Sequence, residues 1–249
     1  MDIREFELRI GQTIIDGYRG DTDRPAVFDL LGRQWDLLDD VWPPTYSPGG
    51  ELHADLIPFG TMAAFLEMGS GAGVMSVLAA LAGCRRVLAL DLNPAAVDNT
   101  LRNARRHGVA DRVEARVSDL YAAVAAGERF DGIYWNPPFF DAPAEHLDGS
   151  LWHETMFDPG FAKLRRFLVD GAGLLTPTGR IYLWFGEALG SPTLIDDLAA
   201  SAGLAVRGLH RTTMAEVPPA IARALPAEAI RGDRHAQWHL HLLELGSTA

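Results

Sequence analysis

Short apolar runs alternate along the chain with longer segments of helical periodicity. The runs that predict strands are Ala63 to Met68, Arg86 to Leu90, Val113 to Val117, Phe130 to Trp135, Arg180 to Phe185, Val206 to Thr212 and His235 to Leu245. The segments that predict helices are Val74 to Leu81, Pro94 to His107, Phe157 to Val169 and Thr193 to Ala202. Buried strands alternating with helices are typical of an α/β domain with a largely parallel sheet.

A different pattern precedes these elements. Ile3 to Gly17 carries a helical stripe of apolar residues, which predicts a helix that packs on the domain or forms a lid. A hairpin is expected around Gly32, followed by a proline-rich turn that contains Trp42 and Tyr46. Both aromatic side chains suit either a pocket wall or core packing. We therefore expect an N-terminal extension at residues 1–58 that packs on a catalytic domain at residues 59–249.

The first central strand ends in a glycine-rich turn. Glu67 is followed by Gly69, Gly71 and Gly73, and the next strand ends at Asp91. Glycines allow a sharp turn and leave room for a ligand against the backbone. A carboxylate at the carboxyl end of the neighbouring parallel strand can accept the hydroxyl protons of a ribose. This pattern predicts a nucleoside site with Asp91 as the ribose ligand.

The glycine spacing differs from that of a dinucleotide site. A dinucleotide fingerprint would place its third glycine at the position of Val74, whereas here it stands at Gly73. An acidic Glu67 would also repel a pyrophosphate. The turn therefore favours a nucleoside cofactor that carries cationic groups.

A second motif follows the strand Phe130 to Trp135. The chain continues with Asn136, Pro137, Pro138 and Phe139. The prolines hold the backbone extended and donate no hydrogen bond, so they fix the direction of the asparagine side chain and carbonyl. The result is a rigid pair of acceptors beside an aromatic wall, although an Asn-Pro turn that merely ends a strand is a simpler interpretation.

These two motifs resemble those of class I S-adenosylmethionine-dependent methyltransferases of the N-P-P-[FY] group, over roughly residues 25 to 190. That group includes release-factor glutamine methyltransferases, small-domain ribosomal RNA guanine methyltransferases and several amine N-methyltransferases. The resemblance implies a Rossmann-like, doubly wound sheet of seven strands, mostly parallel with an antiparallel last strand. It also implies S-adenosylmethionine as cofactor and S-adenosylhomocysteine as product.

The resemblance carries over to individual positions. The cofactor-binding residues it implies are Glu67, Gly69, Gly71, Asp91, Leu92, Asn93, Asp119, Leu120 and Asn136. Of these, Asp119 and Leu120 match residues beside the adenine, and Asp119 could equally cap a helix. Asn136 would hold an acceptor nitrogen in line with the sulfonium methyl, so it is expected to be catalytic together with Pro137 and Phe139. This chemistry needs no metal, and none is expected.

The loop after the N-P-P-F motif is the expected acceptor site. Residues 140–155 are polar and irregular, and such a loop usually carries substrate recognition. The expected substrate-binding residues are Tyr46, Phe139, Phe140, Trp152 and His153, with Glu154 beside them. A solvated loop is the competing interpretation. A further insertion at residues 213–233 could be a lid or an oligomer contact, and in the last strand His239 and His241 are expected on a solvated face.

Composition narrows the possible partners. The formal net charge of the 249 residues is -11, which opposes binding to a nucleic acid backbone. Arg102, Arg105, Arg106 and Arg112 could form a local basic patch but fit better as a solvated helix face. Cys84 is the only cysteine, so an intrachain disulfide is excluded. No run is long enough to cross a membrane and no signal peptide is recognised, so a cytoplasmic enzyme is expected, with a homodimer left open.

Three functions follow from these features. The first is methyl transfer to a nitrogen of a small molecule or amino acid derivative, favoured by the acidic charge and the aromatic loop. A rival acceptor is a protein glutamine. The second function is a different reaction at the same site, which would cyclise the aminopropyl arm of S-adenosylmethionine into azetidine-2-carboxylate and release methylthioadenosine. A cofactor-binding protein without catalysis is the third, disfavoured because both motifs are intact.

Overall fold

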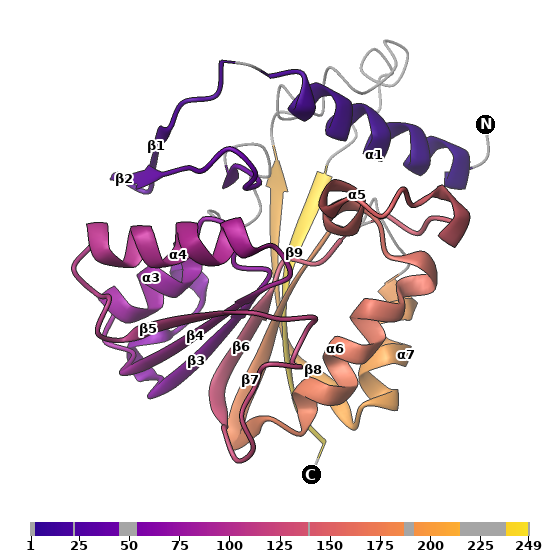
Figure 1. Ribbon diagram of the computed structural model, residues 1–249. Helices are drawn as coiled ribbons and strands as arrows, with labels where there is room; N and C mark the ends of the chain where they lie inside the picture. The colour runs from indigo at the N-terminus through magenta and orange to yellow at the C-terminus, as the bar shows by residue number, and fades with distance from the viewer. Residues whose placement is uncertain are drawn as a thin grey trace.

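The computed structural model describes residues 3–21, 23–44, 54–138, 140–186, 192–214 and 238–248. Its central feature is a seven-stranded sheet with helices on both faces (Figure 1). The strands are β1 (Val27–Leu30), β2 (Arg33–Asp36), β3 (Ala64–Met68), β4 (Arg86–Asp91), β5 (Val113–Val117), β6 (Phe130–Trp135), β7 (Leu175–Gly186), β8 (Leu204–Met214) and β9 (Trp238–Ser247). The α-helices are α1 (Ile3–Arg19), α3 (Val74–Leu81), α4 (Pro94–Arg106), α5 (Leu151–Met156), α6 (Ala162–Ala172) and α7 (Pro192–Ser201).

The strand order of the large sheet is β5-β4-β3-β6-β7-β9-β8. The pairs β3–β4, β4–β5, β3–β6 and β6–β7 are parallel, whereas β9 runs antiparallel to both β7 and β8. This confirms the predicted Rossmann-like sheet with an antiparallel last strand. The order reverses between β3 and β6, and in such sheets the crevice at the carboxyl ends of these strands is where ligands bind.

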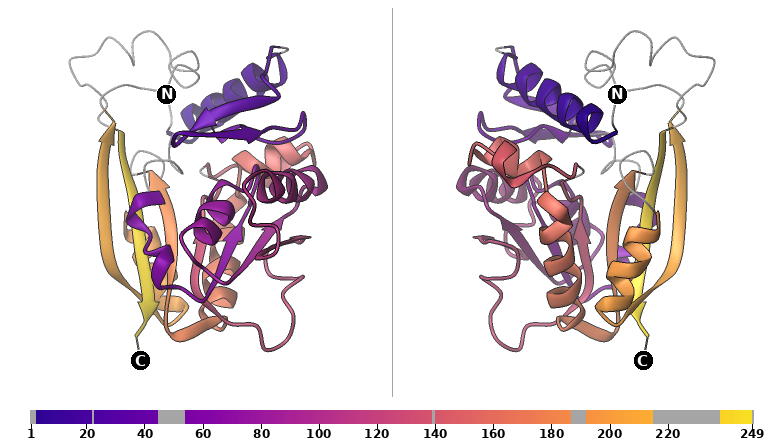
Figure 2. Two further views of the ribbon diagram at one scale, coloured as in Figure 1. Left: turned by 90° about the vertical axis from the view of Figure 1, so that its left-hand side faces the viewer. Right: turned by 90° about the vertical axis from the view of Figure 1, so that its right-hand side faces the viewer.

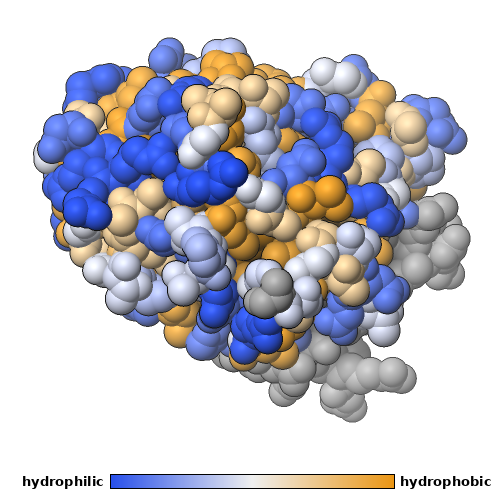
Figure 3. Space-filling model, turned by 90° about the horizontal axis from the view of Figure 1, so that it is seen from below, coloured by the Kyte–Doolittle hydropathy of each residue, from blue (hydrophilic) through white to orange (hydrophobic). Residues whose placement is uncertain are grey.

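Each central strand is buried on both faces. Along β3, Phe65 joins the core under α3 and α4, while the next residue, Leu66, joins the core under α6 and α7. Because successive side chains point to opposite faces, a strand covered on both sides is apolar throughout. Figure 2 shows the two helical layers on either side of the sheet. From below, at the amino ends of the strands, hydrophilic and hydrophobic residues are interspersed on the surface (Figure 3).

The N-terminal segment lies at the opposite end, over the carboxyl ends of the strands (Figure 1). Its hairpin, β1 and β2, is bound to α4 by buried amides: Asn103 Oδ1 accepts a hydrogen bond from the Asp36 amide at 2.8 Å. The Asp36 carboxylate pairs with Arg106 at 2.9 Å and with Arg102 at 3.2 Å. Two of the four arginines considered for a basic patch therefore hold the hairpin. The boundary at residue 58 stays a prediction.

The segment after the N-P-P-F motif differs from its prediction. One helix was expected from Phe157 to Val169, but α5 ends at Met156 and α6 begins at Ala162. Both helices begin at capping residues, which the pattern of apolar positions alone does not reveal. Ser150 caps α5, and the buried Asp158 carboxylate accepts the amides of Lys163 and Leu164 at the start of α6.

Two further expectations concern the C-terminal strands. His241 was expected on a solvated face, but it is only 6% exposed, because it shares its face of β9 with Leu243 and Leu245, which pack in the core under α6 and α7. The side chain of His239 and most of the predicted insertion, from residue 215 on, lie outside the described residues. Within the described part of the chain, no helix combines the length and the apolar character needed to cross a membrane.

Candidate functional site

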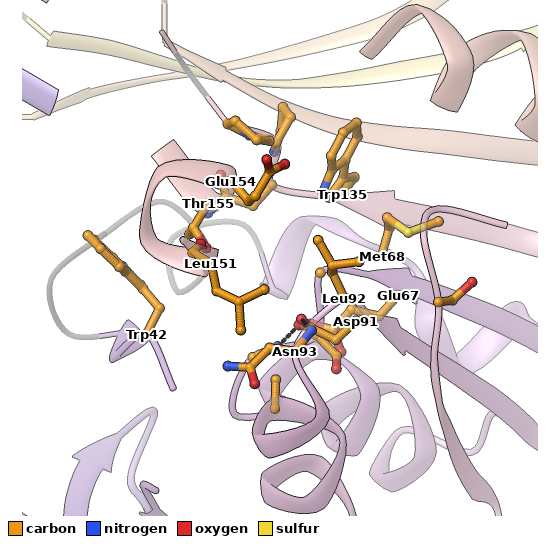
Figure 4. Close-up of a pocket in the computed structure, with 18 of the residues that line it drawn as sticks. Trp42, Glu67, Met68, Asp91, Leu92, Asn93, Trp135, Leu151, Glu154 and Thr155 are labelled. Atoms are coloured by element: carbon orange, nitrogen blue, oxygen red, sulfur yellow. Dashed lines mark hydrogen bonds between the residues drawn. The ribbon is translucent and has the colours of Figure 1, made fainter. Parts of the chain in front are cut away.

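A cavity of about 610 Å³ opens at the carboxyl ends of β3, β4 and β6 (Figure 4). It therefore lies where the strand order reverses. Most residues predicted for the cofactor and the chemistry line it: Glu67, Gly69, Gly71, Asp91, Leu92, Asn93, Asp119, Leu120, Asn136 and Pro137. Trp42, Trp152 and Glu154, which were considered for the pocket wall or the acceptor, line it as well.

The glycine-rich turn is left-handed at each glycine: φ is +62° at Gly69, +52° at Gly71 and +76° at Gly73. Gly73 precedes α3 and packs directly against Thr100 of α4. A Cβ at Gly73 would lie 2.7 Å from Thr100 Cγ2 and 2.8 Å from Thr100 Cα. The turn is thus specified both by its backbone conformation and by the close approach of two helices.

We expect Gly73→Ala to lower the free energy of unfolding by about 3 kcal/mol, from left-handed strain and from overpacking against Thr100. Gly108→Ala is the matched control, because Gly108 has a φ of +71° but no atom within 4 Å of an added Cβ. Gly108→Ala should therefore show only the cost of the left-handed conformation, a loss of about 1 kcal/mol in the free energy of unfolding. Urea unfolding of both variants checks the difference, and equal losses would show that the contact with Thr100 is unimportant.

Asp91 is held at the tip of β4 by the backbone on both sides. Its Oδ2 accepts a hydrogen bond from the Gly71 amide at 2.9 Å, and its Oδ1 accepts one from the Asn93 amide at 2.8 Å. Burial raises the pKa of the Asp91 carboxyl, whereas these amides oppose the rise. A carboxylate oriented in this way keeps lone pairs for the two hydroxyls of a ribose.

Asn93 links the turn to the N-terminal segment. Its Oδ1 caps α4 by accepting the Ala95 amide at 2.9 Å, and its Nδ2 donates to the Asp40 carbonyl at 2.6 Å. This second bond ties the segment that carries Trp42 to the rim of the cavity. The residue therefore connects the expected cofactor site with a wall of the pocket.

Glu67 is buried on β3 below the turn. Its Oε2 accepts hydrogen bonds from the amide and the hydroxyl of Ser76 on α3. Desolvation, with a smaller contribution from the nearby charge of Asp91, raises the pKa of Glu67 to about 8, although the hydrogen bonds from Ser76 lower it. A cationic ligand group in the cavity would favour the ionised carboxylate.

Asn136 lines the cavity directly after the end of β6. Its Oδ1 is buried and accepts no hydrogen bond from any described residue. Pro137 and Pro138 are also buried and line the same cavity. An unpaired buried acceptor is costly, so this oxygen fits a donor group of a ligand. Phe139, the predicted aromatic wall, lies outside the described residues.

The wall opposite Asp91 is aromatic. Trp42 stacks on Tyr18 of α1, with ring centroids 4.6 Å apart, and Trp152 of α5 packs on the same tyrosine at 4.7 Å. Tyr18 itself donates a hydrogen bond to the Val41 carbonyl at 2.6 Å. Thus α1, α5 and the Trp42 segment form one cluster beside the cavity. Tyr46, predicted from the same turn, lies outside the described residues.

Two residues expected at the acceptor do not reach the cavity. Phe140 and His153 are 2% and 5% exposed, and neither belongs to the lining. Phe140 packs in a separate core with Ile10 and Phe157, and the His153 ring stacks near the His146 ring at 5.6 Å. The helical turn of α5 explains the correction, because it directs Trp152 toward the cavity and His153 away from it.

Several lining residues had not been predicted. They include Ser70, Tyr134, Trp135, Leu151, Thr155, Lys163 and Arg166. Tyr134 and Trp135 directly precede Asn136, so their position at a strand end was an available signal. Lys163 and Arg166 had no such signal, because only the packing of α6 brings them to Glu154 at 2.7 Å and to Asp119 at 3.3 Å.

The sequence model of the methyltransferase small domain family matches residues 48–206, which is more than half of the chain. The chain belongs to this family. A release factor glutamine methyltransferase from Cereibacter sphaeroides is 34% identical over 205 residues, which are 76% of this chain and 71% of the relative. This methyltransferase is therefore an enzyme that uses S-adenosylmethionine.

Another curated relative supports the same assignment, and a solved structure shows the same fold. A ribosomal protein uL3 glutamine methyltransferase from Bordetella pertussis is 30% identical over 132 residues, 49% of this chain and 43% of the relative. A methyltransferase solved in complex with S-adenosylhomocysteine shares the fold, with a TM-score of 0.63 and 15% identity over 90% of this chain and 57% of that structure.

These relatives correct one expectation. A small-molecule acceptor was predicted as the partner of this methyltransferase. The two curated relatives described above are named instead for glutamines of a release factor and of a ribosomal protein. Acidic net charge and an aromatic loop were poor guides, because neither property distinguishes a small acceptor from a side chain presented by a protein.

Proposed function

We propose that this methyltransferase transfers a methyl group to the side-chain amide nitrogen of a glutamine in a protein. The observation that carries this proposal is the buried Asn136 Oδ1, which lines the cavity and accepts no hydrogen bond from the described part of the chain. A primary amide offers two N–H donors. One of them suits this oxygen, and the Asn136 carbonyl suits the other.

S-adenosylmethionine supplies a methyl group that is already activated by its sulfonium. The chain then has to orient the acceptor and exclude water. Asn136, held by the two prolines, fixes the amide nitrogen so that its lone pair points at the methyl carbon, and such orientation is a large source of rate enhancement. The nitrogen–carbon bond forms as the sulfur–methyl bond breaks, and one amide proton is released to solvent. Trp42 and Trp152 line the cavity with apolar surface that keeps water from the reacting atoms.

The cofactor roles proposed for this cavity follow the order of the strands. Asp119 and Leu120, after β5, are assigned to the adenine, and Asp91, at the end of β4, to the ribose hydroxyls. Glu67, on β3, is assigned to the cationic end of the cofactor, and Leu92 and Asn93 complete the wall on the α4 side. Residues 1–58 are proposed to cover this site from the carboxyl ends of the strands.

A protein acceptor is supported by the names of the curated relatives, which are a release factor and a ribosomal protein uL3 methyltransferase. A glutamine side chain carries its primary amide at the end of two methylene groups, so it can place the amide in a cavity while the backbone stays outside. The aromatic wall formed with Tyr18 suits its methylene groups, which would otherwise contact water.

The test is to incubate the purified protein and S-adenosylmethionine with an unmethylated release factor and, separately, with ribosomal protein uL3. Peptide mass spectrometry should find one added methyl group on a glutamine of one acceptor, together with S-adenosylhomocysteine. The matched control replaces that glutamine with glutamate, which lacks the nitrogen and must stay unmodified. Methylthioadenosine formed without any acceptor, or methylation of the glutamate variant, would contradict the proposal.

A further inference from the structure

Tyr134 is a buried phenol whose hydroxyl has no evident structural role. It is 3% exposed, lies on β6 two residues before Asn136, and lines the cavity. Its Oη is buried, and none of the described residues forms a hydrogen bond with it. Native proteins rarely leave a buried hydroxyl unpaired, so the group fits a ligand better than a structural contact.

The position of Tyr134 in the sheet indicates which part of the ligand it meets. Tyr134 is the register partner of Glu67 on β3, so both side chains lie side by side on the same face of the sheet. The order β5-β4-β3-β6 places Asp91 one strand beyond Glu67. With the ribose at Asp91 and the adenine toward β5, as proposed above, the amino-acid end of the cofactor would lie over β3 and β6.

That end carries an ammonium and a carboxylate, and the chain must supply a hydrogen-bonding partner for each. Glu67 suits the ammonium, whereas the carboxylate needs a donor. Lys163 and Arg166 line the cavity but are engaged by Glu154 and Asp119 on the α6 side. Burial, together with the charge of Glu67, raises the pKa of Tyr134, so its hydroxyl keeps its proton and remains a donor.

We propose that the Tyr134 hydroxyl donates a hydrogen bond to the carboxylate of the amino-acid end of S-adenosylmethionine. This contact makes the site selective for the complete cofactor over adenosyl compounds that lack the carboxylate. The inference rests on the cavity being the cofactor site of this methyltransferase, and it does not depend on which acceptor is methylated.

Isothermal titration calorimetry with three ligands tests this contact without an acceptor. The ligands are S-adenosylhomocysteine, its decarboxylated analogue, which keeps the amine, and methylthioadenosine, which lacks both groups. Tyr134→Phe should bind S-adenosylhomocysteine about tenfold more weakly, because a hydrogen bond to a charged group is lost. Its affinity for the other two ligands should equal that of the wild type.

The matched control is Tyr121→Phe. Tyr121 Oη is also buried and has no hydrogen-bond partner among the described residues, but Tyr121 packs on Phe167 and lies outside the cavity lining. This variant should bind all three ligands like the wild type. Each variant removes one oxygen without a described partner, so neither should lower the melting temperature of the free protein.

Unchanged binding of S-adenosylhomocysteine by Tyr134→Phe would overturn the inference, and so would an equal loss of affinity for all three ligands, which would indicate a structural role. A wild type that binds the decarboxylated analogue as tightly as S-adenosylhomocysteine would overturn it as well. If Tyr134→Phe weakens only the binding of S-adenosylhomocysteine but no glutamine is methylated, the proposed acceptor is wrong and the role of Tyr134 stands.

Discussion

Replacing Asn136 with alanine will lower kcat for methyl transfer by about 10²- to 10³-fold, the effect of removing one group that orients or stabilises the reacting atoms. The Asn136 side chain is the proposed acceptor for an amide proton, and no other described side chain is bound to its buried Oδ1. Without it only the Asn136 backbone carbonyl holds the amide nitrogen, which then lies in line with the methyl group less often. The backbone carbonyl stays in place, so the affinity for S-adenosylhomocysteine should change little.

The measurement combines steady-state methylation with cofactor titration. A fall in kcat with retained cofactor affinity is the result expected from a loss of orientation, whereas a fall in both would indicate a collapsed site. Because Asn136→Ala also removes a buried acceptor that has no partner among the described residues, the melting temperature should not decrease. A variant that keeps kcat within about threefold of the wild type would exclude Asn136 from the chemistry.

Replacing Glu67 with glutamine will remove a pH-dependent cost of folding. The pKa of Glu67 is about 8 in the folded protein and 4.5 for the free side chain. Between these values the folded protein holds a proton that the unfolded chain has released, so stability falls as pH rises. The cost is absent below pH 4.5 and complete above about pH 8, where it reaches about 4 to 5 kcal/mol at about 1.4 kcal/mol per pH unit.

Glu67→Gln keeps the acceptor for Ser76 but carries no charge. Chemical unfolding of both proteins should therefore give similar stabilities near pH 5 and a more stable variant near pH 8.5. Glu145→Gln changes the same charge at an exposed position and should follow the wild type. Parallel curves for wild type and Glu67→Gln would show that Glu67 ionises normally in the folded protein.

The same substitution separates stability from binding. The carboxylate is the form proposed to hold the ammonium of the cofactor. The affinity of the wild type for S-adenosylhomocysteine should therefore rise from pH 6 to pH 8, as Glu67 loses its proton. Glu67→Gln should bind weakly at every pH. A gain in stability together with a loss of binding is expected where a charge is buried for function.

Most of the strands could be predicted because their signals are local. β5 and β6 have the predicted bounds, and β3 and β4 differ by one residue at one end. A strand that is buried on both faces is apolar without interruption, and glycine or proline marks its end. The same reasoning placed Asp91 and Asn136 at strand ends and therefore at one edge of the sheet.

The acceptor side of the cavity could not be predicted in the same way. Trp152 and His153 are neighbours in a polar segment, yet only the tryptophan lines the cavity. Which face of α5 turns inward depends on how α1 packs against it through Tyr18. That contact joins residues far apart in the chain, and no local pattern in residues 140–155 encodes it.

By itself, the sequence of this methyltransferase determined the α/β alternation, the glycine turn after Glu67 and the placement of Asp91 and Asn136. These features follow from turn chemistry and from the period of apolar residues, which act within a few positions of the chain. Only the tertiary structure decided that Trp42 and Trp152 share a wall and that Tyr134 lies beside Glu67. Strand register and helix packing bring these residues together, because both depend on burying distant apolar faces against one another.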